Sequence, residues 1–235
     1  MTRKILFPLG IGILLIIIGG VAAMRWATRQ APDFYETALA SSAPPEARHE
    51  AARKFAEQTA QLVHDIQYAA NWREEFSQSR VNAWLADELP EQYAKQIPDG
   101  VSDPRVKFED GLVRFGFRLS NSRFDGVISL AVRPTVTGPN RVAITVESLF
   151  AGLLPLAPSA FTDDVTAQLD RYGIEHNWDF VENKPVLHVT IVPTRADHPV
   201  LEELEVDHQR LRIAGYRVEP PALTMSRGPV RARHF

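Results

Sequence analysis

An uncharged run of twenty residues near the amino terminus constrains this chain more than any other feature. The run extends from Ile5 to Met24 and reads ILFPLGIGILLIIIGGVAAM. A helix rises about 1.5 Å per residue, so a helix of this length spans roughly 30 Å, which is the thickness of the hydrocarbon core of a bilayer. The sequence therefore predicts a transmembrane anchor at residues 5–24, held in a membrane and preceded by a short tail at residues 1–4.

A cleaved signal peptide is the alternative interpretation of this run. Such a peptide needs a basic start, an apolar centre of roughly 7–15 residues and a small-residue cleavage site. Arg3 and Lys4 would supply the start, and the residues around Ala22 would supply the site. We favour a retained, single-pass anchor because the run is longer than such a centre and Trp26 follows it, as an interfacial residue would. The short tail favours an extracytoplasmic body, although the basic residues on the two sides of the run nearly balance.

The remainder of the chain is mildly acidic. The first 30 residues hold four of the 26 basic side chains and none of the 29 acidic ones, which leaves a formal net charge of −7 on the rest. Nucleic-acid binders present a clustered basic face, and the only such cluster here lies in the tail at residues 225–235, for which we expect a flexible segment. We therefore expect no nucleic-acid partner. The chain has no cysteine, so disulfides give no information on its compartment.

The exported body is expected to begin after a stalk. The low-complexity stretch Ala38–Pro45 predicts the end of a juxtamembrane stalk at residues 25–45. Residues 46–224 are long enough to form one domain. Apolar residues at spacings of three and four predict a long amphipathic helix over residues 46–70, which we expect to pack on a sheet.

Beyond this helix, strands and shorter helices alternate. Ser77 is a suitable N-cap for a second helix, which Pro90 is expected to stop near Leu89. From Val106 the apolar residues alternate, and the dipeptide Asp110-Gly111 predicts an antiparallel hairpin. The same rules predict loops at residues 91–104 and 134–140, a helix at 159–172 that ends at Gly173, and strands at 72–76, 127–132, 141–150, 178–181, 186–192, 204–206 and 211–218. Four successive strands joined by short turns predict a meander within an α+β domain.

This order of elements resembles the YpmS-like family of membrane-anchored bacterial proteins. The resemblance rests on the helix that carries Val81-Asn82-Ala83-Trp84-Leu85, the hairpin VKFEDGLVRFGFRL and the Gly-Leu-Leu-Pro-Leu segment at residues 152–156, and it covers residues 72–172. More distantly, the order is similar to that of tubular lipid-binding (TULIP-like) domains, in which a curved antiparallel sheet wraps a long helix around an apolar groove. The expected fold is thus α+β, with an N-terminal transmembrane helix followed by a curved antiparallel sheet packed on one or two long helices.

No compact catalytic or metal-binding motif occurs in the chain. The seven histidines lack the spacing of a metal site, and no serine lies in a Gly-x-Ser-x-Gly context. We therefore expect a protein that is not an enzyme and has no metal, cofactor or catalytic residue. Asn82 is expected to bond a neighbouring loop backbone, since most side-chain hydrogen bonds go to backbone or water. A role as a hydrogen-bond donor at the mouth of a groove is the alternative.

The anchor and the apolar helical stripes together predict a domain that binds a lipid or another apolar ligand at the cell envelope. A scaffolding module that recruits an envelope protein is the alternative, and an envelope hydrolase is a third hypothesis. The candidate groove residues are apolar and lie on the predicted helices and the Gly-Leu-Leu-Pro-Leu segment: Phe55, Leu62, Ile66, Trp84, Leu85, Phe150, Leu154, Phe161 and Leu169.

Overall fold

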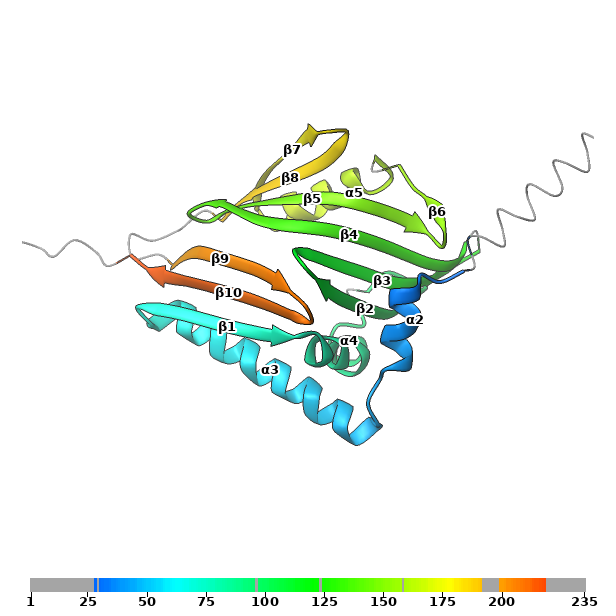
Figure 1. The fold of residues 1–235 in the computed structure, drawn as a ribbon, viewed down its shortest axis with the longest axis horizontal. Helices are drawn as coiled ribbons and strands as arrows, with labels where there is room; N and C mark the ends of the chain where they lie inside the picture. The colour runs from blue at the N-terminus through cyan, green and yellow to red at the C-terminus, as the bar shows by residue number, and fades with distance from the viewer. Residues whose placement is uncertain are drawn as a thin grey trace, which may run out of the picture.

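Helices α2 to α5 and two antiparallel sheets form the body in the computed structural model, which describes residues 28, 30–95, 97–122, 124–157, 159–191 and 199–218 (Figure 1). The helices are α2 (Asp33–Ala40), α3 (Pro45–Tyr68), α4 (Gln78–Gln92) and α5 (Ser159–Arg171). The strands are β1 (Asn71–Ser77), β2 (Val101–Glu109), β3 (Leu112–Ser120), β4 (Asp125–Gly138), β5 (Arg141–Ala151), β6 (Leu154–Pro155), β7 (Glu175–Val181), β8 (Lys184–Thr190), β9 (Pro199–Asp207) and β10 (Arg210–Arg217). The expected α+β body is confirmed.

The larger sheet is curved and has the strand order β2-β3-β4-β5-β8-β7, with β6 paired on β5. Its first four strands form the expected meander, and all pairs are antiparallel. The smaller sheet has the order β1-β10-β9, so β1 pairs with a strand from the far end of the chain. The two sheets lie side by side and meet at the tips of the hairpins β2–β3 and β9–β10 (Figure 1). They also meet at the start of β9, where Asn140, between β4 and β5, bonds the backbone of Pro199 and Leu201.

One face of the smaller sheet packs on the apolar stripe of α3. Phe55, Leu62 and Ile66 of that stripe pack on Trp72 and Phe76 of β1. The rings of Phe55 and Phe76 meet edge to face, with centroids 5.4 Å apart. Burying each such side chain stabilises the fold by roughly 1.5–3 kcal/mol. The prediction that the long helix packs on a sheet is therefore confirmed.

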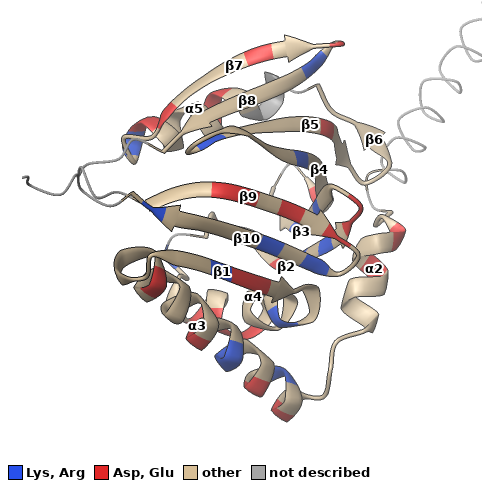
Figure 2. Ribbon diagram, turned by 60° about the vertical axis from the view of Figure 1, so that its left-hand side comes forward, with Lys and Arg blue, Asp and Glu red and all other residues tan. Residues whose placement is uncertain are grey.

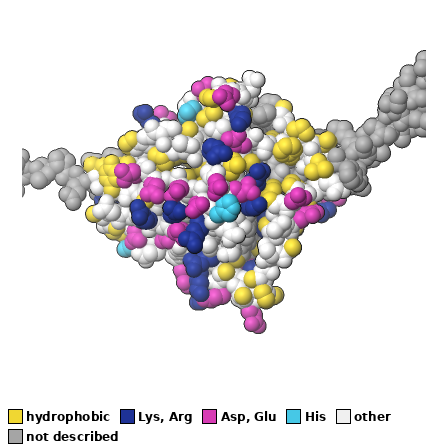
Figure 3. Space-filling model, viewed as in Figure 1, with side chains coloured by type: hydrophobic (Ala, Val, Ile, Leu, Met, Phe, Trp, Pro, Cys, Tyr) yellow, Lys and Arg dark blue, Asp and Glu magenta, His cyan; other side chains and the backbone are white. Residues whose placement is uncertain are grey.

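The opposite face of the smaller sheet carries a lattice of ion pairs between acidic and basic side chains. Side chains alternate between the two faces of a strand, and Arg73 and Glu75 of β1 point away from α3. Arg212 of β10 lies at the centre of the lattice, where its guanidinium reaches Glu75, Glu205 and Asp207 at 3.4, 2.6 and 3.1 Å. Acidic and basic bands lie next to each other across β1, β10 and β9 in Figure 2, and Figure 3 shows the same interleaving on the surface. Such mixed charge keeps a sheet face hydrated.

The stretch expected to form a stalk instead includes a packed helix. Helix α2 lies on β2, with Tyr35 and Ala38 buried. Helix α2 can approach the sheet this closely because residue 116 of β3 is glycine. A Cβ at Gly116 would lie 2.9 Å from Cδ2 of Tyr35. The body therefore begins before residue 46. The helix was missed because its eight residues, DFYETALA, carry too short a periodic pattern to be distinguished from a polar linker.

Two prolines also lie within elements that they were expected to end. Pro90 stands in the last turn of α4, which continues to Gln92 because the amide of Tyr93 still donates to the carbonyl of Leu89 at 3.0 Å. Pro134 lies inside β4, which runs to Gly138 where a loop was predicted. It is tolerated there because the pairing of β3 with β4 stops at Val132, so that β5 is the strand paired with this part of β4.

Candidate ligand-binding cavity

A bulge in β2 opens the candidate site. The register of β2 with β3 shifts between Ser102 and Arg105, and Asp103 has a positive φ of 50°. Pro104 follows and has no amide hydrogen with which to continue the ladder. The hydroxyl of Tyr35 donates to the carbonyl of Asp103 at 2.9 Å, and burial, with a further contribution from Asp103, raises the pKa of this tyrosine and keeps it a donor. Helix α2 thus holds the bulge in place from one side.

An apolar cavity of about 500 Å³ lies on the other side of the bulge, between β3 and the end of α4. This volume is within the roughly 300–1,000 Å³ range of small-molecule sites. Phe115 and Phe117 of β3 form one wall, with ring centroids 5.9 Å apart. The other lining residues come from α4, the following loop and the bulge: Ala86, Leu89, Pro90, Ile97, Pro98, Val101, Ser102, Asp103 and Pro104.

The lining determines what this cavity can hold. Apart from backbone groups, its polar side chains are the hydroxyl of Ser102 and the carboxylate of Asp103. Apolar walls favour a hydrocarbon group, and each buried methylene contributes about 0.8 kcal/mol. The carboxylate disfavours an anionic group beside it. The cavity is therefore suited to an acyl chain or a similar apolar body with a neutral polar end.

Two amide side chains fix α4 against the edge of β2. Asn82 donates through Nδ2 to the carbonyl of Val106 at 2.9 Å, and its Oδ1 accepts from the amide of Val106 at 2.8 Å. One turn earlier, Oε1 of Gln78 accepts from the amide of Phe108 at 2.8 Å. These contacts satisfy backbone groups of an edge strand that would otherwise be open to another chain. Asn82 bonds backbone, as predicted, but that backbone belongs to strand β2 and not to a loop, and the role of Asn82 is to position the helix that walls the cavity.

The structure places five of the nine candidate groove residues in the packed core. Phe55, Leu62 and Ile66 of α3 and Trp84 of α4 lie in or against the core beneath the smaller sheet. Leu85, 8 % exposed, packs with Val106 and Phe108 and directly precedes Ala86, the first residue of α4 that lines the cavity. These side chains pack between secondary-structure elements. Their role in ligand binding stays a prediction.

The other four candidate residues lie elsewhere. Phe150 lines a second, smaller pocket of about 180 Å³ beside α2. Leu154 on β6 and Leu169 on α5 are half-buried. The side chain of Phe161 lies outside the described part of the chain. The candidate residues are therefore not gathered around one groove.

The sequence pattern missed the residues that do line the cavity. Phe115 and Phe117 were expected to face the core of a hairpin, and residues 91–104 were expected to form a loop. The dipeptide Asp103-Pro104 was taken as part of that loop, whereas it is a bulge inside a strand. An Asp-Pro pair directly before an alternating run is the signal that could have located the cavity.

No protein family, curated protein or solved structure matches this chain. Among the residues that the structure describes, no helix has both the length and the apolar character required to cross a bilayer. The predicted anchor at residues 5–24 and the predicted tail at 225–235 lie outside the described residues. The cavity is therefore interpreted from its own chemistry.

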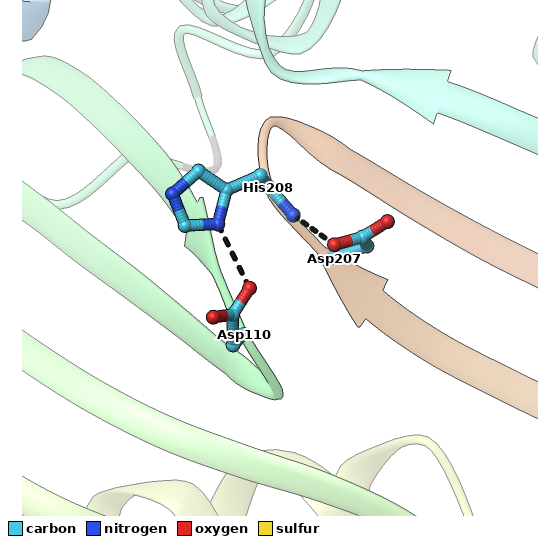
Figure 4. A group of neighbouring side chains, drawn as sticks. All are labelled: Asp110, Asp207 and His208. Carbon is cyan, nitrogen blue, oxygen red and sulfur yellow. Dashed lines mark hydrogen bonds and ion pairs between the residues drawn. The ribbon is translucent and has the colours of Figure 1, made fainter.

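A separate polar cluster joins the two sheets at their hairpin tips (Figure 4). Nδ1 of His208 lies 2.8 Å from a carboxylate oxygen of Asp110, and Oδ1 of Asp207 accepts from the amide of His208 at 2.7 Å. Two backbone bonds accompany them, from the amide of Gly111 to Val206 and from that of Gln209 to Phe108, at 2.8 and 3.2 Å. The cluster thus acts as a joint between the sheets.

The same three side chains are the one group in the described chain that offers enough ligand atoms for a metal ion. Their ligand atoms lie within 4.8 Å of one another. Asp110 and His208 are exposed, and the other carboxylate oxygen of Asp207 pairs with Arg212 at 3.1 Å. An ion would have to compete with that pair and with the His208–Asp110 contact, so we assign the cluster to the joint.

The joint is expected to be sensitive to pH. The hydrogen bond and charge of Asp110 raise the pKa of His208 above 6.5, with smaller contributions from Asp207 and Glu109. The contact therefore stabilises the fold fully below the ordinary histidine pKa, and this contribution is lost as the pH rises through the raised value. We expect Asp110→Asn to lower the pKa of His208 in an NMR titration, and Asp207→Asn to lower it less. Equal shifts in the two variants would contradict this assignment.

Proposed function

We propose that this protein is a non-catalytic, membrane-anchored domain that binds a lipid or another apolar ligand at the extracytoplasmic side of the envelope. The cavity between α4 and the β2 bulge carries the proposal, because its size and its apolar walls suit an acyl chain. Residues 5–24 would supply the anchor, and the resemblance to the YpmS-like and tubular lipid-binding families agrees with this role.

Photolabelling of the full chain in lipid nanodiscs would test the proposal. A fatty alcohol with a diazirine in the middle of its chain, whose polar end is neutral, is added, the sample is irradiated, and tryptic peptides are analysed by mass spectrometry. The cavity walls fall in the peptides 81–95, 96–105 and 115–118. We expect all three to be labelled. Labelling of the anchor peptide without these three would contradict the proposal.

A pair of matched substitutions makes this test specific to the cavity. Ala86→Phe places a ring in the cavity, whereas Ala60→Phe places the same ring on an exposed position of α3. Loss of room for about two methylenes costs about 1.6 kcal/mol, so Ala86→Phe should weaken labelling of peptides 96–105 and 115–118 about tenfold. Ala60→Phe should leave the labelling unchanged. A circular dichroism spectrum checks that both variants are folded.

One observation favours the alternative role as a scaffold. Strand β7 ends the strand order of the larger sheet in the described chain, and it exposes Phe180 and Val181, which are 66 % and 53 % accessible. An apolar sheet edge can accept a strand from another protein. A photocrosslinking amino acid at Phe180 in intact cells should then give one dominant protein adduct, and its absence would remove the support for this role.

A further inference from the structure

The end of β5 and the short strand β6 form an apolar projection. The chain carries no charged side chain from Ser148 to Thr162. It reverses at Gly152, whose φ is +60° and whose amide donates to the carbonyl of Val127 at 2.7 Å. A bond of 2.9 Å from the amide of Leu156 to Leu149 closes the turn. Leu153 is left 51 % exposed, so the projection presents hydrocarbon to its surroundings.

Helix α2 extends this apolar surface. Pro32 and Phe34 line the pocket of about 180 Å³ together with Phe150 and Leu153. Hydrophobic side chains gather over this region in Figure 3. We call residues 152–157 together with Pro32, Phe34 and Phe150 the apolar lip. Asp33 and Glu36 lie beside Phe34 on α2, and Arg114, which also lines this pocket, is paired with Glu109, so the lip offers mainly apolar contact.

The described chain starts at this same end of the sheet. The carbonyl oxygen of Thr28 lies 2.2 Å from the position that a Cβ on Gly126 would occupy, and Gly126 precedes the Val127 that bonds the lip. Only four residue steps separate Thr28 from Met24, the last residue of the apolar run. A chain spans at most about 3.6 Å per residue, so Thr28 lies no more than about 14 Å from the end of that run.

We propose that the apolar lip rests in the interfacial layer of the bilayer that holds residues 5–24. This inference depends on the membrane anchoring in the proposed function, and it adds a defined orientation. The pairing Phe117–Ile128, then Ile128–Ala151, then Ala151–Leu154 joins a wall of the cavity to the lip. The cavity therefore lies at the membrane-facing end of the body, where an acyl chain has a short path from the bilayer.

Quenching by spin-labelled lipid would test this orientation. The chain has no cysteine, so Leu153→Cys gives a single site for an environment-sensitive fluorophore. Val63→Cys is a matched control, because Val63 is also aliphatic and is 50 % exposed, on the part of α3 that lies away from β6 (Figure 1). Each full-length variant is reconstituted in phosphatidylcholine vesicles with and without a phosphatidylcholine that carries a nitroxide near its headgroup.

We expect the nitroxide to quench most of the fluorescence at position 153 and little at position 63. High salt should leave the quenching unchanged, because the contact is apolar. Equal, weak quenching at both positions would overturn the orientation, and energy transfer between donor- and acceptor-labelled copies at position 153 would assign the lip to self-association instead. A chain that fails to float with the vesicles would refute the anchor itself, whereas a floating chain with a labelled cavity and an unquenched lip would refute the orientation alone.

Discussion

Replacing Gly215 by alanine should destabilise the fold by about 3 kcal/mol or more, the upper end of the usual cost of overpacking. Gly215 lies at a register shift in β10, opposite Trp72. An added Cβ would lie 2.0 Å from the carbonyl oxygen of Val200 and 2.2 Å from Cζ2 of Trp72. Because Trp72 is only 6 % exposed, neither the ring nor the backbone has room to move. Thermal unfolding followed by circular dichroism should show a Tm lower by about 10 °C.

Gly138 provides the control for this substitution. It also lies in a strand, and the nearest atom to an added Cβ is 3.9 Å away. Gly138→Ala should change the free energy of unfolding by less than about 0.5 kcal/mol. Equal Tm values for the two alanine variants would show that the smaller sheet is not packed as described.

Replacing Arg48 by alanine should cost about 3 kcal/mol, because it leaves a buried carboxylate without its main partner. Nε of Arg48 donates to Oδ1 of Asp87 at 2.6 Å, and the side chain of Asp87 is only 6 % exposed. Nδ1 of His49 lies 2.8 Å from the other carboxylate oxygen but out of hydrogen-bonding alignment. Urea unfolding would measure the loss, with the midpoint lowered and the slope unchanged.

A second substitution separates the buried charge from the lost packing of the arginine. Adding Asp87→Asn to Arg48→Ala removes the charge and keeps the shape, so the double variant should be more stable than Arg48→Ala alone. Arg53→Ala is the surface control, because Arg53 pairs with Glu50 on the exposed side of α3, and its removal should have little effect. A double variant no more stable than Arg48→Ala would contradict the role given to the buried charge.

Local turn chemistry made much of this fold predictable from sequence. The end of α5 is one example: Gly173, with a φ of +64°, and Ile174 donate to the carbonyls of Asp170 and Leu169, as in a Schellman motif. In the hairpin β7–β8, Glu182 and Asn183 both have positive φ, which suits a two-residue turn. Such signals depend on neighbouring residues, so they are visible in the sequence whatever the rest of the chain does.

Long-range pairing and the cavity could not be predicted in the same way. Nothing in the local sequence of β1 specifies that Asn71 pairs with Tyr216, because any apolar alternating strand would satisfy its pattern. The candidate site was sought on the most apolar helical stripes, and those are the stripes that the fold buries. The cavity lies where the strand pairing is interrupted, at Asp103 and Pro104. A bulge produces no repeating pattern of apolar residues, so a search for hydrophobic periodicity does not find it.

The pairing of β1 with β10 also sets the order in which the body can assemble. About 140 residues separate the two strands, so the surface that receives α3 is incomplete until β10 has left the ribosome. Until then the apolar stripe of α3 can pack only on β1 and α4, so the part that β9 and β10 cover later stays open to chaperones or to wrong partners. A nascent chain stopped before β9 would carry a complete meander and a helix α3 whose apolar stripe is only partly covered.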